Sequence, residues 1–276
     1  MPELPEVEHV VRALRAAVKG REILSAQLRL PRIAPELSNK QFGSRLRRAR
    51  INDVRRRGKY IVFDLSNGKM LLTHLRMTGK FISLGVEEEL PAHAHVIFFL
   101  DNDRRLVFCD VRQFGRMLVV ETKKFLDTKQ IKELAPEPLT EDFSLNYFAE
   151  RLAKSRRPIK QLLLDQTKVL GLGNIYAAEA LYRARISPFA VPADLSRQRV
   201  KRLHGAIIEI LQTAIDGGST LRISLDDEGN SYIGSSERFW RVYEREGEPC
   251  ERCGARIKRV TQAGRSTYYC PRCQRR

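Results

Sequence analysis

Two pairs of cysteines near the C-terminal end constrain the fold of this chain more than any other feature. Two residues separate Cys250 from Cys253 and Cys270 from Cys273, and sixteen residues lie between the pairs. Each pair can supply two thiolates to a tetrahedral Zn²⁺, and a hairpin between the pairs would bring them together. No spare ligand is evident, so the spacing predicts one structural zinc in a ribbon-like finger. The alternative is a pair of redox or chance turns.

The finger belongs to a chain with a large excess of positive charge. The 276 residues include 50 Lys and Arg against 33 Asp and Glu, a formal net charge of +17. Such a balance favours a polyanionic partner, with nucleic acid preferred to an anionic membrane. The sequence shows no export signal and no apolar run of about 18 residues, which predicts a cytoplasmic protein that does not span a membrane.

The first half of the chain has the pattern of one helix followed by strands. Apolar residues from Val7 to Val18 recur with helical spacing and predict a helix over residues 5–18. Short β-type runs follow, separated by turn residues such as Asn67-Gly68. These runs are Glu22–Leu30, Arg45–Val54, Lys59–Leu65, Met70–Met77, His95–Leu100, Arg104–Cys109 and Arg116–Glu121. The pattern predicts an antiparallel β-sandwich with the N-terminal helix laid on it.

Helical periodicity dominates the second half, after a break over residues 122–142 that contains Pro136 and Pro138. The predicted helices are Phe143–Lys154, Pro158–Gln166, Asn174–Arg185 and Ser196–Ile215. Residues 219–236 are polar and rich in Gly and Ser, which predicts a mobile loop. The chain is thus expected to be an α+β multidomain protein, with a β-sandwich domain (1–134), a helical domain (135–236) and a zinc finger (237–276).

The first residues, MPELPEVE, offer a reactive amine. A small residue after the initiator methionine favours removal of Met1, which leaves Pro2 with a free secondary amine. An α-amino group has a pKa of about 7.7–8.0, so part of it is unprotonated at neutral pH and can attack an aldehyde-like carbon. Glu3 and Glu6 lie beside it as a candidate acid, base or sugar contact. The alternative is a plain helix start, which suits Pro5 and the acidic residues.

Lys59 ends a basic stretch over residues 44–59, which holds eight basic residues and one acid. Strand alternation would place Lys59 on one face with Ile61 and Phe63, at the edge of an apolar surface. Its ammonium could then bind a phosphate or act in proton transfer. The alternative is that the ammonium extends to solvent.

A turn with Gly171 and Gly173 precedes the helix predicted to begin at Asn174. It is not a dinucleotide fingerprint, because Tyr176 stands where a third glycine would be. The amides at the helix start suit a phosphate, and Asn174 is predicted to be an N-cap, a phosphate contact or both. The alternative is a plain turn between two helices.

Met77 and Phe114 are apolar residues for which core packing is the default interpretation. The functional alternative makes them wedges that enter a base stack, with Arg112 as a polar partner. His74 is interpreted as a packed histidine or a phosphate ligand, and Cys109 as a buried small hydrophobe.

A series of motifs along the whole chain resembles the formamidopyrimidine-DNA glycosylase and endonuclease VIII family. In order, they are MPELPEVE, RRRGKYIVF, THLRMTGKF, CDVRQFGR, GLGNIYAAEAL and the cysteine finger. The wording Leu4-Pro5-Glu6-Val7 is closer to the formamidopyrimidine-DNA glycosylase branch.

The resemblance implies roles for residues at the reaction centre. Pro2 would form a Schiff base with the deoxyribose anomeric carbon, and Glu3 would act as general acid and base on the sugar. Lys59 would contact phosphate and assist base excision. Arg265 of the finger, counted with these catalytic residues, would grip the phosphates that flank the lesion.

The resemblance also implies DNA contacts. Arg112 would pair with the orphaned base, Met77 and Phe114 would fill the gap left by the extruded nucleotide, and Asn174 would bind phosphate from a helix–two-turn–helix motif. His74 and Lys258 are further contacts, and loop 219–236 would fold over the flipped base. The turn over residues 110–115 has Val111 and Gln113 where Pro and Arg are common in the family. These two departures put the stiffness of the backbone and one phosphate contact in doubt.

The expected function is a bifunctional DNA glycosylase and AP lyase of base excision repair. It would excise oxidised purines, such as 8-oxoguanine and formamidopyrimidines, and nick the abasic strand by β,δ-elimination. Damaged double-stranded DNA is the expected partner of a monomeric, nucleoid-associated cytoplasmic enzyme. The alternatives are an endonuclease VIII-type enzyme for oxidised pyrimidines and a non-catalytic zinc-ribbon DNA-binding protein.

Overall fold

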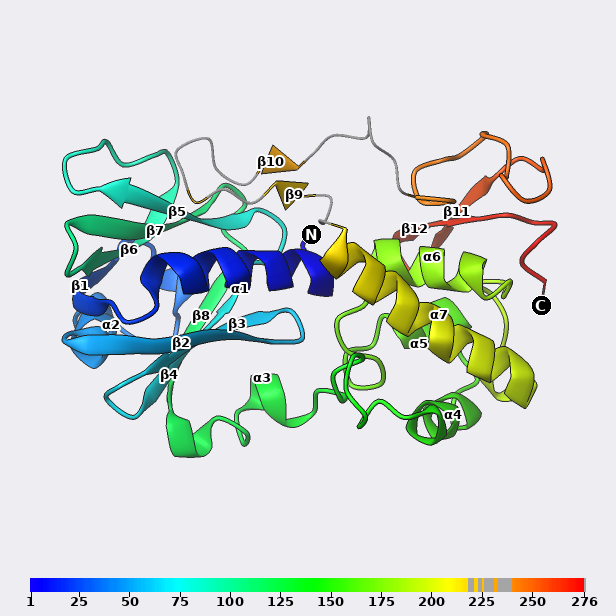
Figure 1. Ribbon diagram of the computed structural model, residues 1–276, viewed down its shortest axis with the longest axis horizontal. Helices are drawn as coiled ribbons and strands as arrows, with labels where there is room; N and C mark the ends of the chain where they lie inside the picture. The colour runs from blue at the N-terminus through cyan, green and yellow to red at the C-terminus, as the bar shows by residue number, and fades with distance from the viewer. Residues whose placement is uncertain (218–220, 223–224, 226–230, 233–239, 276) are drawn as a thin grey trace. The chain divides into compact units, whose positions relative to one another are not determined.

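The chain divides into two units, each with its own buried side chains. Unit 1 comprises Met1–Lys132 with Gly218–Ile233, and unit 2 comprises Glu133–Gly217 with Gly234–Arg276. The computed structural model (Figure 1) describes residues 1–217, 221–222, 225, 231–232 and 240–275.

Helix α1 (Leu4–Val18) opens unit 1 and buries one complete apolar face. The side chains on this face are at most 1% exposed, and they are the ones expected from the helical spacing: Val7, Val10, Val11, Leu14 and Val18. The helix packs on strand β2 (Ala49–Arg57), where the Arg15 Nε donates to the Val54 carbonyl at 2.9 Å. The predicted N-terminal helix is confirmed.

Eight antiparallel strands form the sheet of unit 1, in the order β5-β7-β6-β1-β2-β3-β4-β8. Besides β2, they are β1 (Glu22–Leu28), β3 (Tyr60–Leu65), β4 (Lys69–His74), β5 (Gly79–Gly85), β6 (Ala94–Leu100), β7 (Arg104–Asp110) and β8 (Arg116–Glu121). Strands β1 and β2 join the two halves through the pairs Glu22↔Arg50 and Ile23↔Ala49.

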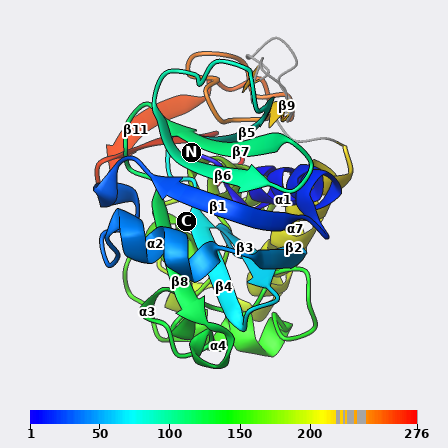
Figure 2. The same ribbon diagram turned by 90° about the vertical axis from the view of Figure 1, so that its left-hand side faces the viewer.

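The two halves of this sheet face each other across a shared core (Figure 2). Phe63 of β3 and Phe81 of β5 are far apart in the strand order, yet their ring centroids lie 5.8 Å apart. Both side chains belong to one cluster of buried residues. The predicted antiparallel β-sandwich is therefore confirmed.

Two parts of unit 1 differ from the predicted elements. Residues Asn39–Leu46 form helix α2, where a strand was expected from Arg45; Ser38 caps the helix by accepting the Gln41 N–H at 3.2 Å. Strand β5 was not predicted at all. Phe81 points into the main core and its neighbour Ile82 into a second cluster, so a strand buried on both faces shows no alternation.

Two connections cross between the halves of the sandwich at the same end. The Met77 loop (residues 75–78) joins β4 to β5, and the Phe114 loop (residues 111–115) joins β7 to β8. The strand pairs His74↔Arg116 and Gly79↔Asp110 flank the two loops. The topology therefore places these loops side by side.

Unit 2 consists of helices and a hairpin (Figure 1). The helices predicted for it are present as α4 (Leu145–Ala153), α5 (Ile159–Leu163), α6 (Asn174–Arg183) and α7 (Arg197–Asp216). Strands β11 (Lys258–Gln262) and β12 (Arg265–Tyr269) form the hairpin between the two cysteine pairs. The remaining short elements are η1 (Pro31–Ile33), η2 (Thr122–Lys124) and α3 (Lys129–Lys132) in unit 1, and η3 (Pro192–Asp194) in unit 2.

The predicted mobile loop over residues 219–236 lies largely outside the described residues. Within it, β9 (Leu221–Arg222) pairs with β10 (Ser231–Tyr232). The Leu225 carbonyl accepts the Ser83 N–H at 2.6 Å, and its side chain packs against the main core of unit 1. In the described part of the chain, no helix has the length and apolar character needed to cross a membrane.

Candidate active site

Charged side chains are buried around the start of α1. Glu3 and Glu6 are each 2% exposed, and Lys59 is 6% exposed. The Glu3 N–H donates to the Glu6 Oε2 at 2.8 Å, which satisfies one of the free amides at the helix start. Carboxylates are stable when buried only if they are paired or hydrogen-bonded, so this arrangement is costly unless opposite charges lie nearby.

The N-terminal amine interacts electrostatically with these three side chains. Burial lowers the pKa of the Met1 amine below its ordinary value of 8.0, and the positive charges of Lys59 and Arg112 lower it further, while Glu3 and Glu6 oppose them. A lower pKa increases the share of free base, which is the nucleophilic form of an amine. Pro2, the next residue, is itself buried. The structure thus brings together Pro2, Glu3 and Lys59.

Lys59 occupies a position that differs from the predicted one. It lies in the two-residue turn Gly58-Lys59 between β2 and β3, not on a strand face with Ile61. Gly58 has a φ of +58°, which suits the first central position of such a hairpin. Strand alternation could not predict this position, because it does not extend into a turn.

Arg56, which the sequence pattern did not single out, fixes this turn against α1. Its Nη1 donates to the Gly58 carbonyl at 3.1 Å, and its Nε donates to the Glu8 Oε2 at 3.0 Å. These contacts connect the lysine turn to helix α1, which follows Pro2 and Glu3. The side chain is 11% exposed, so this ion pair is partly shielded from solvent.

His74, at the end of β4, is a buried and neutral histidine. Burial, followed by the charges of Arg76 and Lys59, lowers its pKa to about 3. Its Nδ1 accepts the Arg76 N–H at 3.0 Å, and its ring lies edge-on to Tyr60 with centroids 4.8 Å apart. Since Nδ1 is an acceptor, the proton of the neutral ring is on Nε2, which can donate.

Met77 and Phe114 are not core residues. They are 39% and 41% exposed, at the tips of the two adjacent loops. The guanidinium carbon of Arg112 lies 4.9 Å from the centroid of the Phe114 ring, at cation–π distance. Both loops contact Asp110, a fully buried residue that the sequence pattern did not single out.

The four cysteines of unit 2 form a site that fits zinc. Their sulfur atoms all lie within 4.8 Å of one another, with Cys250 to Cys273 at 3.9 Å and Cys253 to Cys270 at 3.5 Å. A tetrahedral site with Zn–S bonds of about 2.3 Å separates its sulfurs by about 3.8 Å. The geometry and the all-thiolate donor set therefore match a closed, structural Zn²⁺ site.

Helix α6 and the chain before it hold the finger in place within unit 2. Glu179 accepts the backbone N–H groups of Arg241, Val242 and Tyr243, each at 2.9 Å. Burial raises its pKa, against the effect of these donors. The Lys160 Nζ donates to the Ser266 carbonyl at 2.9 Å and to the Thr267 Oγ1 at 2.7 Å. Neither Glu179 nor Lys160 was singled out from the sequence.

The finger presents Arg265 near the tip of its hairpin. Arg265 is exposed, and the next residue, Ser266, also accepts the Asn174 amide at 3.0 Å. Of the two roles predicted for Asn174, the N-cap is wrong, because Gly173 holds that position. The Asn174 Oδ1 is buried without a hydrogen-bond partner. Lys258 pairs with Tyr269 at the base of the hairpin, so it lies at the opposite end from Arg265.

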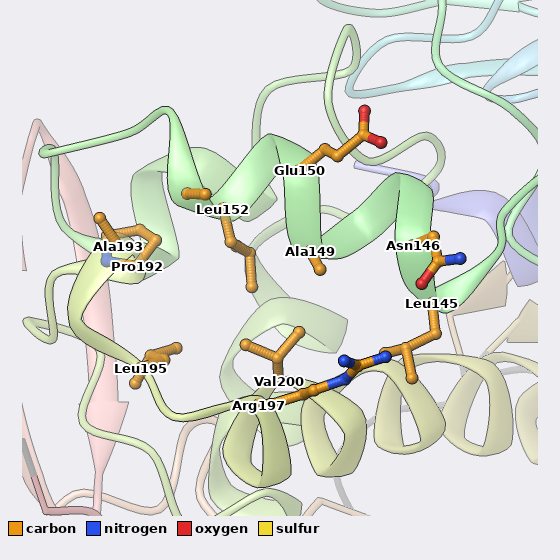
Figure 3. A pocket seen from close by; sticks show the side chains of 11 residues that line it. Leu145, Asn146, Ala149, Glu150, Leu152, Pro192, Ala193, Leu195, Arg197 and Val200 are labelled. Carbon is orange, nitrogen blue, oxygen red and sulfur yellow. The ribbon is translucent and has the colours of Figure 1, made fainter.

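An apolar groove of about 420 Å³ in unit 2 is separate from all these residues (Figure 3). It lies between α4 and the start of α7. Leu152 and Val200 point into it, whereas Glu150 points away. None of the predicted site residues lines this groove, although Glu150 and Arg197 are among its lining residues.

Comparisons with known proteins place the chain in a family. Family models match three successive segments: the formamidopyrimidine-DNA glycosylase N-terminal domain (residues 1–117), the formamidopyrimidine-DNA glycosylase H2TH domain (134–224) and the zinc finger found in that family and in isoleucyl-tRNA synthetase (247–276). The chain belongs to the formamidopyrimidine-DNA glycosylase family. Its finger therefore holds one structural zinc, as the cysteine geometry indicates.

Relatives in this family match over their full length. The formamidopyrimidine-DNA glycosylase of Pelotomaculum thermopropionicum is 45% identical over 100% of this chain and 99% of its own. That of Bacillus subtilis is 40% identical over 99% of both chains. A crystal structure of the Lactococcus lactis enzyme with abasic-site DNA has a TM-score of 0.91 and 38% identity, over 99% of this chain and 100% of that one.

Replacement of one zinc ligand tests the role of the finger. In Cys253→Ala, three thiolates remain, and zinc content measured by atomic absorption should fall from about one ion per chain to near zero. DNA binding should be lost while unit 1 stays folded. The matched control is Cys109→Ala, at the buried free cysteine of unit 1, which should keep its zinc. Unchanged DNA affinity in Cys253→Ala would contradict a clamping role for the finger.

The low pKa of His74 makes unit 1 sensitive to acid. The His74 ring takes up a proton near pH 3 in the folded state and near pH 6.5 in the unfolded state. The contribution of the neutral ring to the free energy of unfolding is therefore fully present above pH 6.5 and is lost as the pH falls. One proton corresponds to about 1.4 kcal/mol per pH unit. Between pH 6.5 and 5, wild type should thus lose about 2 kcal/mol more than His74→Gln in urea unfolding.

The exposed His93 provides the control for this measurement. The variant His93→Gln should keep the wild-type pH dependence, because its ring lies at the surface. Identical pH profiles for wild type and His74→Gln would show that His74 is not buried as a neutral ring.

Proposed function

We propose that this chain is a bifunctional DNA glycosylase and AP lyase of base excision repair that acts on oxidised purines. The observation that carries the proposal is the burial of Pro2 together with Glu3 and Lys59 at the start of α1. Family membership and the Lactococcus lactis complexes, one with abasic-site DNA and one with formamidopyrimidine-containing DNA, support a repair glycosylase.

In the proposed reaction, Met1 is removed and the Pro2 nitrogen becomes the nucleophile. It bonds to C1′ of the damaged nucleotide while the bond from C1′ to the base breaks, and the base leaves with that electron pair and takes up a proton. The amine loses its own proton. Glu3 then protonates the ring oxygen, the sugar ring opens, and an iminium joins Pro2 to C1′.

The iminium provides the lyase activity. It withdraws electrons from C1′, so a proton is removed from C2′ and the bond to the 3′ phosphate breaks. A second elimination releases the 5′ phosphate, and water hydrolyses the imine to free Pro2. Glu6 supports the site by accepting the Glu3 N–H. Lys59 contacts phosphate and assists base excision, and its positive charge, which lowers the pKa of the Met1 amine, favours the free base of an amine at this position.

Other residues bind and open the duplex. Extruding a nucleotide costs a few kcal/mol, so contacts that hold the opened duplex are needed. Met77 and Phe114 enter the vacated space, and Arg112 pairs with the orphaned base. His74, neutral and with a proton on Nε2, donates to a phosphate. Arg265, Asn174 and Lys258 of unit 2 contact the phosphates, Arg265 at those that flank the lesion.

The chain acts as a monomer on damaged double-stranded DNA in the cytoplasm, associated with the nucleoid. Its working divisions are the catalytic domain (1–134), the helix–two-turn–helix domain (135–236) and the zinc finger (237–276). The net charge of +17 supports this partner, because released counterions stabilise basic proteins on DNA.

Oxidised pyrimidines are the second candidate substrate class. One observation favours them: a structure of the Lactococcus lactis enzyme, with 37% identity and a TM-score of 0.90, contains an oxidised pyrimidine in its DNA. A panel of single lesions opposite each normal base separates the two classes by their rates of strand cleavage.

Cleavage of this lesion panel tests the proposal directly. Duplexes with 8-oxoguanine or formamidopyrimidine should be cut to a one-nucleotide gap with phosphate at both ends. A duplex with 5-hydroxycytosine should be cut at about one tenth of that rate or below. In Glu3→Gln the general acid is lost, so cleavage should slow by about 10²-fold or more while DNA binding persists.

Two other outcomes would assign a different function. Faster cleavage of 5-hydroxycytosine than of the purine lesions would show the substrate preference of an endonuclease VIII-type enzyme. Binding without cleavage of any lesion, in a sample whose N-terminal residue is Pro2, would make the chain a non-catalytic DNA-binding protein.

A further inference from the structure

One buried carboxylate bonds to both the Met77 loop and the Phe114 loop. Asp110 is the last residue of β7 and has no exposed surface. Its Oδ1 accepts a hydrogen bond from the Thr78 hydroxyl in the Met77 loop. Its Oδ2 accepts the Gly115 N–H of the Phe114 loop at 2.7 Å. Both oxygens of one side chain are thus used, one for each loop.

Thr78 also connects the loops directly. While its hydroxyl donates to Asp110, its Oγ1 accepts the Arg112 N–H at 3.1 Å. The Arg112 backbone is thereby held by the loop that carries Met77. Within the Phe114 loop, the Gln113 N–H donates to the Asp110 carbonyl at 3.2 Å, which closes the turn.

The ring of Phe108 lies against two glycines beside the loops, Gly79 at the start of β5 and Gly115 at the end of the Phe114 loop. A Cβ atom added at Gly79 would lie 2.8 Å from the Phe108 Cζ, and one added at Gly115 would lie 2.6 Å from the same atom. Real Cβ atoms do not approach so closely, so both glycines are needed for this contact. The Gly79↔Asp110 strand pair brings these residues together.

We propose that Thr78 and Asp110 are positioning residues that make the two loops a single rigid wedge. The inference rests on the proposed function, in which Met77, Arg112 and Phe114 enter the opened duplex. The loops share one buried carboxylate, and because the Thr78 Oγ1 accepts the Arg112 N–H, a displacement of either loop breaks a hydrogen bond of the other. The three side chains therefore enter together, and the cost of ordering two separate loops is met when the protein folds.

Thr78→Val tests this inference, because valine has nearly the same shape and lacks the hydroxyl. Loss of the hydroxyl leaves the Asp110 Oδ1 and the Arg112 N–H without this partner. The value of kcat/KM for 8-oxoguanine in duplex DNA should fall by about tenfold. Cleavage of a preformed abasic site in single-stranded DNA should be unchanged, since no nucleotide is extruded and no base is orphaned.

Thr78→Ser is the matched control. Serine keeps the hydroxyl and should restore cleavage of the duplex substrate to nearly the wild-type rate. A loss of both activities in Thr78→Val would indicate general damage to unit 1 and would overturn the assignment. Wild-type rates on both substrates would overturn it as well.

Hydrogen exchange separates a failure of this inference from a failure of the proposed function. The amides of Arg112 and Gly115 should exchange faster in Thr78→Val than in Thr78→Ser, whether or not the wild-type protein cleaves DNA. Equal exchange in the two variants would overturn the rigid wedge. If wild type cleaves no lesion but the exchange rates differ as expected, the wedge stands and the glycosylase proposal falls.

Discussion

Burial of Pro2 among charged side chains is the constraint on which the candidate active site depends. Two carboxylates, Glu3 and Glu6, are almost inaccessible to solvent, and the buried Lys59 provides an opposite charge. Such a cluster is stable only where its members are held at fixed positions. The apolar face of α1 fixes the helix on the sandwich, and Arg56 fixes the turn of Lys59 against that helix. The fold of unit 1 thus determines the surroundings of Pro2, the proposed nucleophile.

Local patterns predicted the parts of the fold that depend on local physics. The spacing of apolar residues in α1 follows from helix geometry, and all of the expected side chains are buried. The cysteine pairs predicted a tetrahedral sulfur cluster because zinc accepts few other arrangements. Helix α2 was missed although its signal is present: Ser38 and Gln41 have the spacing of a capping box.

Features that depend on contacts between distant segments could not be predicted in this way. Strand β5 is buried on both faces and therefore lacks alternation. Asp110 gains the Thr78 hydroxyl as a partner only when β5 and β7 pair, and Glu179 gains its three donors only when the finger folds back onto α6. Met77 and Phe114 have apolar side chains whose exposure follows from the crossing of two loops, which no spacing reveals.

The most direct test of the central claim is the identity of the atom that bonds to the sugar. Wild-type protein is incubated with 8-oxoguanine duplex and sodium borohydride, which reduces an imine to a stable amine, and the trapped complex is digested and analysed by mass spectrometry. The sugar remnant should be found on the nitrogen of Pro2, in a peptide that lacks Met1. A remnant on the ε-amine of Lys59, or no covalent adduct in a sample that begins with Pro2, would contradict the N-terminal nucleophile.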